Sequence, residues 1–582
     1  MRCLAALTMG ASLALTPVLH AQEEGPAPTA PTGNSGGDIV GYRQIHSPVV
    51  GRGAGMVSSQ SAIATRVGTA ILLQGGNAVD AAVATAFAEA VALPRAGNLG
   101  GGGYMLVHMA ANAGRPATDV AINYYGVAPH AITPDLLVGA DGKIDHVKEM
   151  SFSGVAVPGT VAGLYEAHKR FGKLPWTAVI DPAIALAQDG VILTDGEAEA
   201  TAGRRFMLVR DPGARAAFLK SDGSPYRSGE RFRQPDLSWT LRQIRDGGPD
   251  AFYKGAVARR LVAGIKAGGG IIDMADLAAF RPDVSAPIWS TYRGLRIAYM
   301  PPTSSGVTLA EAMNLIEHYP MKSYRWGSVD SLHVLSEAMK VANADRQLVG
   351  GAPQWKTPAA GLASKAFADE RVKLISMKTS LDGKVVPDGN PYPFESKNTT
   401  HLVVADAAGN AVSNTFTLSS SYGAHVAAPG TGFLLNDSLG NFAWIHRSEH
   451  NKANWPAAGK RLGSTITPLI VFKDDRPWLV TGTPGGGYII ATMAQILVNV
   501  IDFGLNVAEA AERPRINQGG GDAPLELEDG FSPDIVPLLE ARGHKVKPSL
   551  TMGSTQSVMI DRGRFLGAAD SRRPDALALG AE

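Results

Sequence analysis

Cysteine is almost missing from this sequence of 582 residues, which contains a single one, Cys3. A chain with one cysteine forms no internal disulfide, and removal of a leader that carries Cys3 leaves no thiol for catalysis. The fold must therefore depend on a buried apolar core. The length of the chain and its 45% content of hydrophobic residues are enough for one large domain or several smaller ones.

An excess of charge of either sign is also missing, because 54 Lys and Arg residues stand against 53 acidic residues. This balance gives no electrostatic reason to expect a nucleic-acid partner. The apolar run at residues 4–19 is too short to span a membrane. With Arg2 before it and His20-Ala21-Gln22 after it, the run predicts a signal peptide over residues 1–21 and a periplasmic or secreted protein without a membrane anchor. Residues 22–50 predict a flexible linker.

Helical periodicity dominates the first part of the chain, and strand patterns appear from residue 400 onward. This order, with one more helix after the strands, predicts a layered α+β domain. Asn77 and Asp330 are the expected N-caps of two of the helices. We expect helices over residues 61–74, 78–92, 158–170, 176–188, 331–349 and 489–503, and strands over 402–404, 411–418, 466–472 and 478–481.

Three motifs resemble common sites but lack their usual context. The glycine-rich run at residues 97–103 is not followed by Gly-Lys-Ser/Thr, so close backbone packing is expected there and not a phosphate loop. Residues 446–450 read His-Arg-Ser-Glu-His, a zinc pattern, but residues 451–456 after it indicate an exposed polar loop. We therefore expect no metal. Asn398-Thr399-Thr400 is also a weak glycosylation signal.

Hydroxyl side chains gather in the second part of the sequence. Alternating threonines suit a sheet, but a buried sheet does not need so many, because each buried hydroxyl must find a hydrogen-bond partner. A threonine becomes a nucleophile when a base lies beside it, and its own free α-amine is one such base. Thr399 has a free amine only if the bond from Asn398 is cut. The cluster comprises Thr399, Thr400, Thr415, Thr417, Ser419, Ser420, Ser421, Ser464, Thr465 and Thr467.

Further motifs lie at residues 55–59, 74–82, 100–103, 303–306, 399–401, 482–486, 502–510 and 552–557. Together they resemble the γ-glutamyltranspeptidase (glutathione hydrolase) family of N-terminal nucleophile hydrolases. The resemblance extends from about Gly55 to the end of the chain. It implies a four-layer αββα sandwich and a precursor that cuts itself between Asn398 and Thr399. A large subunit over 51–398 would then pair with a small subunit over 399–582 and act on a small-molecule amide without any cofactor.

The resemblance also implies roles for individual residues. Thr399 would be the nucleophile, with its own amine as the base, and the Thr417 hydroxyl would bond to it. The backbone N–H groups of Gly485 and Gly486 would form the oxyanion hole, where each donor typically contributes a few kcal/mol. A hydroxyl pair, Ser464 and Thr465, would hold the substrate carboxylate.

Four further positions implied in substrate binding depart from the family pattern. Tyr125 stands where the family has an arginine that binds the α-carboxylate of the γ-glutamyl group. Asn441 stands where the family has an aspartate that binds its α-amine. Ser419 replaces the asparagine of Thr-Leu-Asn, and Ser438 replaces an acidic or amide residue. The chemistry is therefore expected to be intact, whereas the two charges that would hold a glutamyl head are missing.

Three functions remain open at this point. The first is hydrolysis or transfer of γ-glutamyl amides such as glutathione. The second is an acylase, related to cephalosporin acylases, that acts on glutaryl or other amides without the α-amino group. The third is an inactive exported binding protein, which the presence of Thr399, Thr417, Gly485 and Gly486 disfavours.

Overall fold

The structure is a computed structural model that describes residues 46–112, 114–382, 386, 398–445 and 449–582. The predicted signal peptide over 1–21 lies outside the described residues, and so does the predicted linker as far as residue 45. Val49 and Val50, at the end of that linker, belong to a short strand, β1 (Val49–Gly51). None of the helices in the described part of the chain combines the length and the apolar character needed to cross a bilayer.

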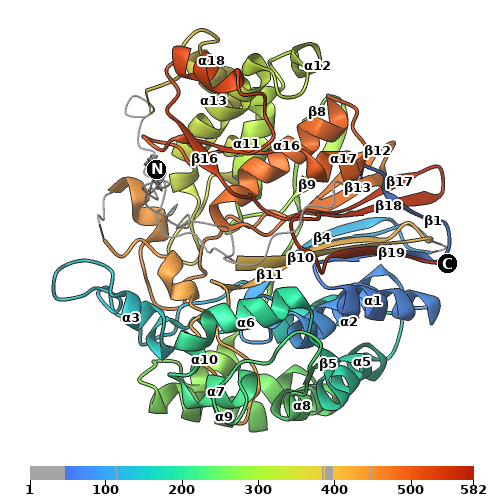
Figure 1. Ribbon diagram of the computed structural model, residues 1–582, viewed down its shortest axis with the longest axis vertical. Helices are drawn as coiled ribbons and strands as arrows, with labels where there is room; N and C mark the ends of the chain where they lie inside the picture. The colour runs from blue at the N-terminus through green and yellow to red at the C-terminus, as the bar shows by residue number, and fades with distance from the viewer. Residues whose placement is uncertain (1–45, 113, 383–385, 387–397, 446–448) are drawn as a thin grey trace, which may run out of the picture. The chain divides into compact units, whose positions relative to one another are not determined.

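Two seven-stranded sheets form the centre of residues 46–582 (Figure 1). All strand pairs in both sheets are antiparallel. The first sheet has the order β19 (Leu577–Ala581), β2 (Gly55–Ser59), β10 (Asn398–Asp406), β11 (Ala411–Ser419), β3 (Gly102–Met109), β4 (Thr118–Asn123) and β7 (Asp283–Ser285). The second has the order β1, β18 (Arg564–Ala569), β17 (Gln556–Asp561), β13 (Arg476–Gly482), β12 (Leu469–Lys473), β9 (Leu295–Tyr299) and β8 (Ile288–Tyr292).

Helices cover the outer faces of both sheets, and Figure 1 shows the two helical layers on opposite sides of the strands. The arrangement gives four layers, as predicted. The layer over the first sheet includes α1 (Ala62–Leu73), α2 (Ala78–Ala92), α4 (Thr160–Phe171), α5 (Trp176–Asp189), α6 (Asp195–Leu208), α8 (Pro235–Tyr253) and α9 (Ala256–Ala267). The layer over the second includes α11 (Gly306–Ile316), α13 (Val329–Asp345), α16 (Ile489–Ile501), α17 (Val507–Glu512) and α18 (Ile535–Ala541).

Both faces of strand β10 are buried, and polar and apolar residues therefore hardly alternate along its sequence. Leu402 and Val404 pack in the core between the first sheet and its helices, whereas Val403 and Ala405 pack in the core that includes the second sheet. Successive side chains of a strand point to opposite faces, so Thr400 lies on the helical side of the sheet, where its hydroxyl reaches a residue of α2.

Helix α2 shows how composition sets packing. Asn77 caps it as predicted, and the Asn77 and Asp80 side chains form a reciprocal capping box. All of its residues are buried, and its alanines let α1 and β10 approach closely. The predicted cap of α13 is wrong: Ser328, and not Asp330, accepts from the backbone at the start, and the helix ends at Asp345.

The glycine-rich run packs against backbone, as expected. A Cβ on Gly100, Gly101 or Gly103 would lie 1.9–2.4 Å from a carbonyl oxygen of Leu434, Thr417 or Thr415. Real Cβ atoms do not approach so closely. Gly101 and Gly103 therefore let the start of β3 lie directly against β11, and Gly100 lets the chain before β3 lie against Leu434.

Candidate active site

Thr399 lies at the start of β10, directly opposite a second threonine. The strand begins at Asn398, and its backbone register places Thr399 against Thr417 of β11. The register shifts between Asn398 and Thr399, so the ladder is irregular at the proposed cleavage point. The structure thus places side by side two backbone positions that are 18 residues apart in the chain, and the hydroxyl bond that the resemblance implies between them stays a prediction.

Thr417 is completely buried, and its hydroxyl oxygen accepts from the backbone N–H of Ser419 at 2.9 Å. Ser419 follows with a φ of +83°, a region that residues other than glycine and asparagine seldom occupy. Such strained residues concentrate at functional sites. The bend turns the chain away from the sheet immediately after the predicted catalytic threonine.

His401 is neutral in this environment. Its Nδ1 lies 2.8 Å from the Thr415 hydroxyl, and burial lowers the pKa of the imidazole to about 3. The ring lies under Gly482, where a Cβ would approach a ring carbon to 2.3 Å. The end of β13 is therefore held against the face of β10 that carries His401.

The loop after β13 carries the predicted oxyanion-hole residues. Gly485 has a φ of +140° and Gly486 a φ of +55°, conformations that favour glycine. A Cβ on Gly485 would also lie 3.0 Å from the Cα of Gly553. The loop leads directly into α16, which begins at Ile489.

The predicted binding residues converge on the Tyr125 hydroxyl. The Asn441 amide nitrogen donates to this hydroxyl at 2.8 Å, and the Ser419 hydroxyl donates to the Asn441 amide oxygen at 3.3 Å. The side chains of Ser438 and Ser464 also interact with the Tyr125 hydroxyl and lower its pKa against the effect of burial. Burial raises the pKa of Tyr125 above its ordinary value, so the phenol stays neutral. Sequence comparison thus identified a real spatial cluster, and every hydrogen-bonding group in it is uncharged.

Thr465 follows Ser464 in the chain and is buried. The Ser464 oxygen accepts from the backbone N–H of Ile466 at 3.2 Å, and its carbonyl accepts from the Ser305 hydroxyl at 2.8 Å. A hydrogen bond from the motif at residues 303–306 therefore holds this segment in place.

Charged groups lie behind this neutral cluster. Arg461 donates to the Tyr125 carbonyl oxygen at 2.7 Å, and Arg346 donates to Ser305 at 2.9 Å. On another side Asp437 accepts from the backbone N–H of Ser420 at 2.8 Å. Burial raises the pKa of Asp437 to about 7, so a large fraction of this carboxyl is protonated at neutral pH.

Sequence reasoning missed three buried residues that shape the site. Tyr104 stacks on Tyr125 with ring centroids 5.2 Å apart. Asp437 lies next to Ser438 in the chain. Glu89 of α2 accepts from the Thr400 hydroxyl at 3.2 Å. A usable signal existed for Glu89 alone, because an acid near the end of an alanine-rich helix, far from the capping turn, is unusual.

The zinc pattern at residues 446–450 lies partly outside the described residues. The expectation of an exposed polar loop after it is wrong. Residues Glu449–Asn454 form a 3₁₀ helix, and Asn451 and Asn454 are buried. Asn454 donates to the Asn441 carbonyl oxygen at 2.6 Å. This segment therefore supports the Tyr125 cluster, because side-chain amides there satisfy backbone groups of the core.

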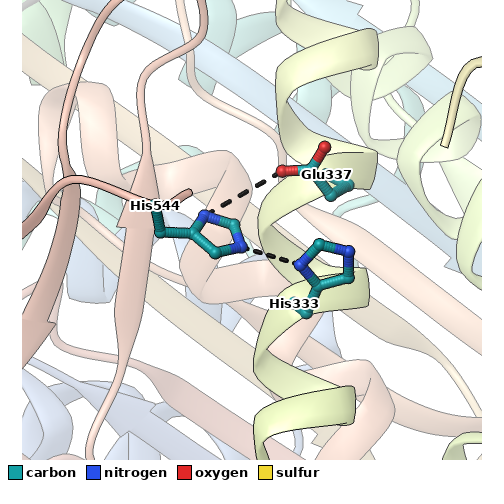
Figure 2. Close-up of side chains that lie close together, drawn as sticks. All are labelled: His333, Glu337 and His544. Atoms are coloured by element: carbon teal, nitrogen blue, oxygen red, sulfur yellow. Dashed lines mark hydrogen bonds and ion pairs between the residues drawn. The ribbon is translucent and has the colours of Figure 1, made fainter. Parts of the chain in front are cut away.

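A different group of buried side chains has the composition of a metal site (Figure 2). His333 and Glu337 lie one turn apart on α13 and face His544, which follows α18. His333 Nδ1 and His544 Nε2 are 2.7 Å apart, and His333 Nε2 is 2.7 Å from the Ser376 carbonyl oxygen. Since a carbonyl only accepts, Nε2 of His333 carries its proton and Nδ1 accepts from His544.

Three protein donors already bond to the carboxylate of this cluster. Glu337 accepts from Lys340 at 2.9 Å, from the Ser380 hydroxyl at 3.0 Å and from the Leu381 backbone at 2.6 Å. Burial lowers the pKa of His544 to about 3. The lone pairs that a metal would need serve hydrogen bonds, and the Lys340 ammonium already balances the carboxylate. The group fits a structural network better than a cation site.

Comparison with known proteins defines the class. Residues 64–580 match the family model described as Gamma-glutamyltranspeptidase. With two sheets between helical layers, this match shows an N-terminal nucleophile enzyme of the hydrolase and transferase type. The chain belongs to the γ-glutamyltranspeptidase family.

Its relatives include proteins that are named for two different activities. A glutathione hydrolase proenzyme of Escherichia coli (strain K12) is 40% identical over 538 residues, which are 90% of this chain and 92% of the relative. An acylase ACY 1 proenzyme of Pseudomonas sp. (strain V22) is 38% identical over 88% of this chain and 91% of its own. A cephalosporin acylase structure from Bacillus halodurans has a TM-score of 0.81 at 29% identity, covering 97% of this chain and 100% of that one. These matches confirm the predicted fold.

Proposed function

We propose that the chain matures by cutting itself between Asn398 and Thr399. The Thr399 hydroxyl oxygen attacks the Asn398 carbonyl carbon, and the peptide nitrogen leaves with a proton, so that an ester replaces the amide. That step already frees the Thr399 α-amine, and water then hydrolyses the ester to give the Asn398 carboxylate and the Thr399 hydroxyl. The irregular ladder at this bond and the position of Thr399 opposite Thr417 support the proposal.

The mature enzyme would use Thr399 for amide hydrolysis or acyl transfer. Its free amine titrates near pH 8, so a useful fraction is neutral and can accept the hydroxyl proton. The oxyanion of the tetrahedral intermediate would be held by the backbone N–H groups of Gly485 and Gly486. Collapse releases the amine product and leaves an acyl ester on Thr399, which water or an acceptor amine then removes. No step requires a metal or another cofactor.

The favoured acyl group carries a carboxylate but no α-ammonium, as glutaryl does. One observation carries this choice: the Asn441 amide bonds to the Tyr125 phenol at 2.8 Å, and the resemblance implies charged residues at both of these positions for binding a glutamyl head. A buried ammonium without a counter-charge is unfavourable. Ser464 and Thr465 would hold the carboxylate, and Arg346 behind Ser305 adds positive potential.

γ-Glutamyl amides such as glutathione are the second candidate. The 40% identity to a glutathione hydrolase proenzyme favours them, and Asp437 near Tyr125 is the acid that an ammonium could approach. A periplasmic or secreted location, which the predicted leader indicates, suits either substrate class.

Two measurements test these proposals. Purified protein should show two polypeptides, and the smaller should begin Thr-Thr-His-Leu, whereas Thr399→Ala should remain one inactive chain. An active but uncut preparation would contradict self-cleavage. For the acyl group, kcat/KM should be compared on a glutaryl and a γ-glutamyl anilide with the same leaving group. We expect a preference for glutaryl of roughly tenfold to a thousandfold, as one or two unpaired charges would give.

A further inference from the structure

Glu89 is a completely buried acid that touches the residue next to the proposed nucleophile. It lies on α2, and both of its carboxyl oxygens are 3.2 Å from the Thr400 hydroxyl. The Ser59 hydroxyl and the Gln60 backbone N–H also interact with this carboxyl and lower its pKa against the effect of burial. One carboxyl group thus collects donors from β10 and from the end of β2.

These donors meet where the sheet loses part of its ladder. β2 pairs with β10 from Gly55 opposite Asp406 to Ser59 opposite Leu402, and then leaves the sheet. The residues of β10 before Leu402 consequently have β11 on one side only. The register shift before Thr399 weakens even that pairing. Backbone hydrogen bonds alone therefore hold the start of β10 loosely.

We propose that Glu89 is a positioning residue for Thr399, which holds the start of β10 through Thr400 where the ladder to β2 has ended. This inference rests on the proposed role of Thr399. Glu89 acts before cleavage, when the Asn398 carbonyl must lie in reach of the Thr399 hydroxyl, and afterwards, when the same hydroxyl must face the substrate. Misplacement of a reacting group by about 1 Å can lower a rate about 100-fold.

The charge state of Glu89 suits this task. Burial raises its pKa to about 8, so the carboxyl is protonated at neutral pH. A protonated carboxyl donates one hydrogen bond and accepts others, and can therefore satisfy two hydroxyls and a backbone N–H together. Glutamine has the same capacity and nearly the same shape, whereas leucine has the shape without the hydrogen bonds.

The test removes the contact from each side. Glu89→Leu and Thr400→Val should each lower kcat on a preferred anilide by about tenfold or more, with KM changed by less than about twofold. Both should also slow self-cleavage of newly made precursor. Glu89→Gln should restore most of the rate. Thr85→Val is the matched control, because Thr85 is buried on the same helix but bonds to the Ala81 carbonyl oxygen.

The outcomes test the positioning role of Glu89 separately from the proposed role of Thr399 as the nucleophile. If Glu89→Leu and Thr400→Val both keep kcat and cleavage within about threefold of the wild type, the positioning role is refuted. If Glu89→Leu does not fold, Thr400→Val decides alone, because it removes the same hydrogen bond. A Thr399→Ala protein that still cuts and turns over substrate would overturn both ideas. An inactive Thr399→Ala beside fully active Thr400→Val would overturn only the positioning role.

Discussion

Replacing Glu89 by glutamine should stabilise the protein relative to the wild type, and this difference should grow as the pH rises. The ordinary pKa of a glutamate is 4.5, and burial raises the pKa of Glu89 to about 8. Between these values the folded protein keeps a proton that the unfolded chain releases. The wild type therefore loses stability from about pH 4.5 to about pH 8 and no further above it. Glutamine does not titrate and is free of this loss.

The magnitude follows from the width of that window. Each pH unit contributes about 1.4 kcal/mol, which gives a loss of about 3 kcal/mol at pH 7 and about 4 to 5 kcal/mol above pH 8. A protein of this size has an unfolding entropy of roughly 1 kcal/mol per kelvin near its midpoint. The wild type should therefore melt roughly 3 to 5 °C below Glu89→Gln at pH 8, and close to it at pH 5.

Thermal unfolding followed by circular dichroism between pH 5 and pH 9 would measure this difference. Both proteins should carry Thr399→Ala, so that self-cleavage does not alter the samples. Thr85→Val in the same background is the control and should shift Tm equally at every pH. A difference between Glu89→Gln and the parent that stays constant from pH 5 to pH 8.5 would refute the reasoning.

Three other predictions concern charge at the site. Asp437→Asn should raise Tm progressively from about pH 4 to pH 7 and then by a constant amount, because burial raises the pKa of Asp437 to about 7; a gain that is the same at pH 4 and pH 7 would contradict this. Tyr125→Arg combined with Asn441→Asp should shift the ratio of kcat/KM toward γ-glutamyl over glutaryl anilide, by about tenfold or more; an unchanged ratio would mean that other residues select the acyl group. EDTA should leave the rate unchanged; inhibition that zinc reverses would show that a metal takes part.

Elements with strong local patterns could be predicted from the sequence. The helix over residues 78–92 was correct because Asn77 caps it and proline follows it, and both signals are local. The strand over 411–418 was correct because its β-branched and hydroxyl residues suit a sheet. The Asp330 cap was wrong because two candidate residues lie close together, and the approach of the chain to the helix selects Ser328.

Features that depend on contacts distant in the chain could not be predicted. The burial of Asn454 follows from its bond to Asn441, and nothing near residue 454 indicates it. Glu89 meets Thr400 across 311 positions. The mutual arrangement of Tyr125, Ser438, Asn441 and Ser464 came from resemblance to a family, since no spacing in this sequence places them together. Residues that act through tertiary contacts need a structure.

The segment around β2 and the segment around β19 lie side by side, although one is early and the other late in the chain. β19 pairs with β2 along its whole length, the Ala54 N–H donates to Ala581 at 2.6 Å, and the Arg52 N–H donates to the Glu582 carboxylate at 2.9 Å. A gene could therefore be circularly permuted here, with a short link from Glu582 to Val49 and translation starting at Met-Thr399. Removal of the initiator methionine would expose the threonine amine directly. The enzyme would then be active as a single polypeptide without self-cleavage. The effect of a substitution on turnover could thus be measured separately from its effect on maturation.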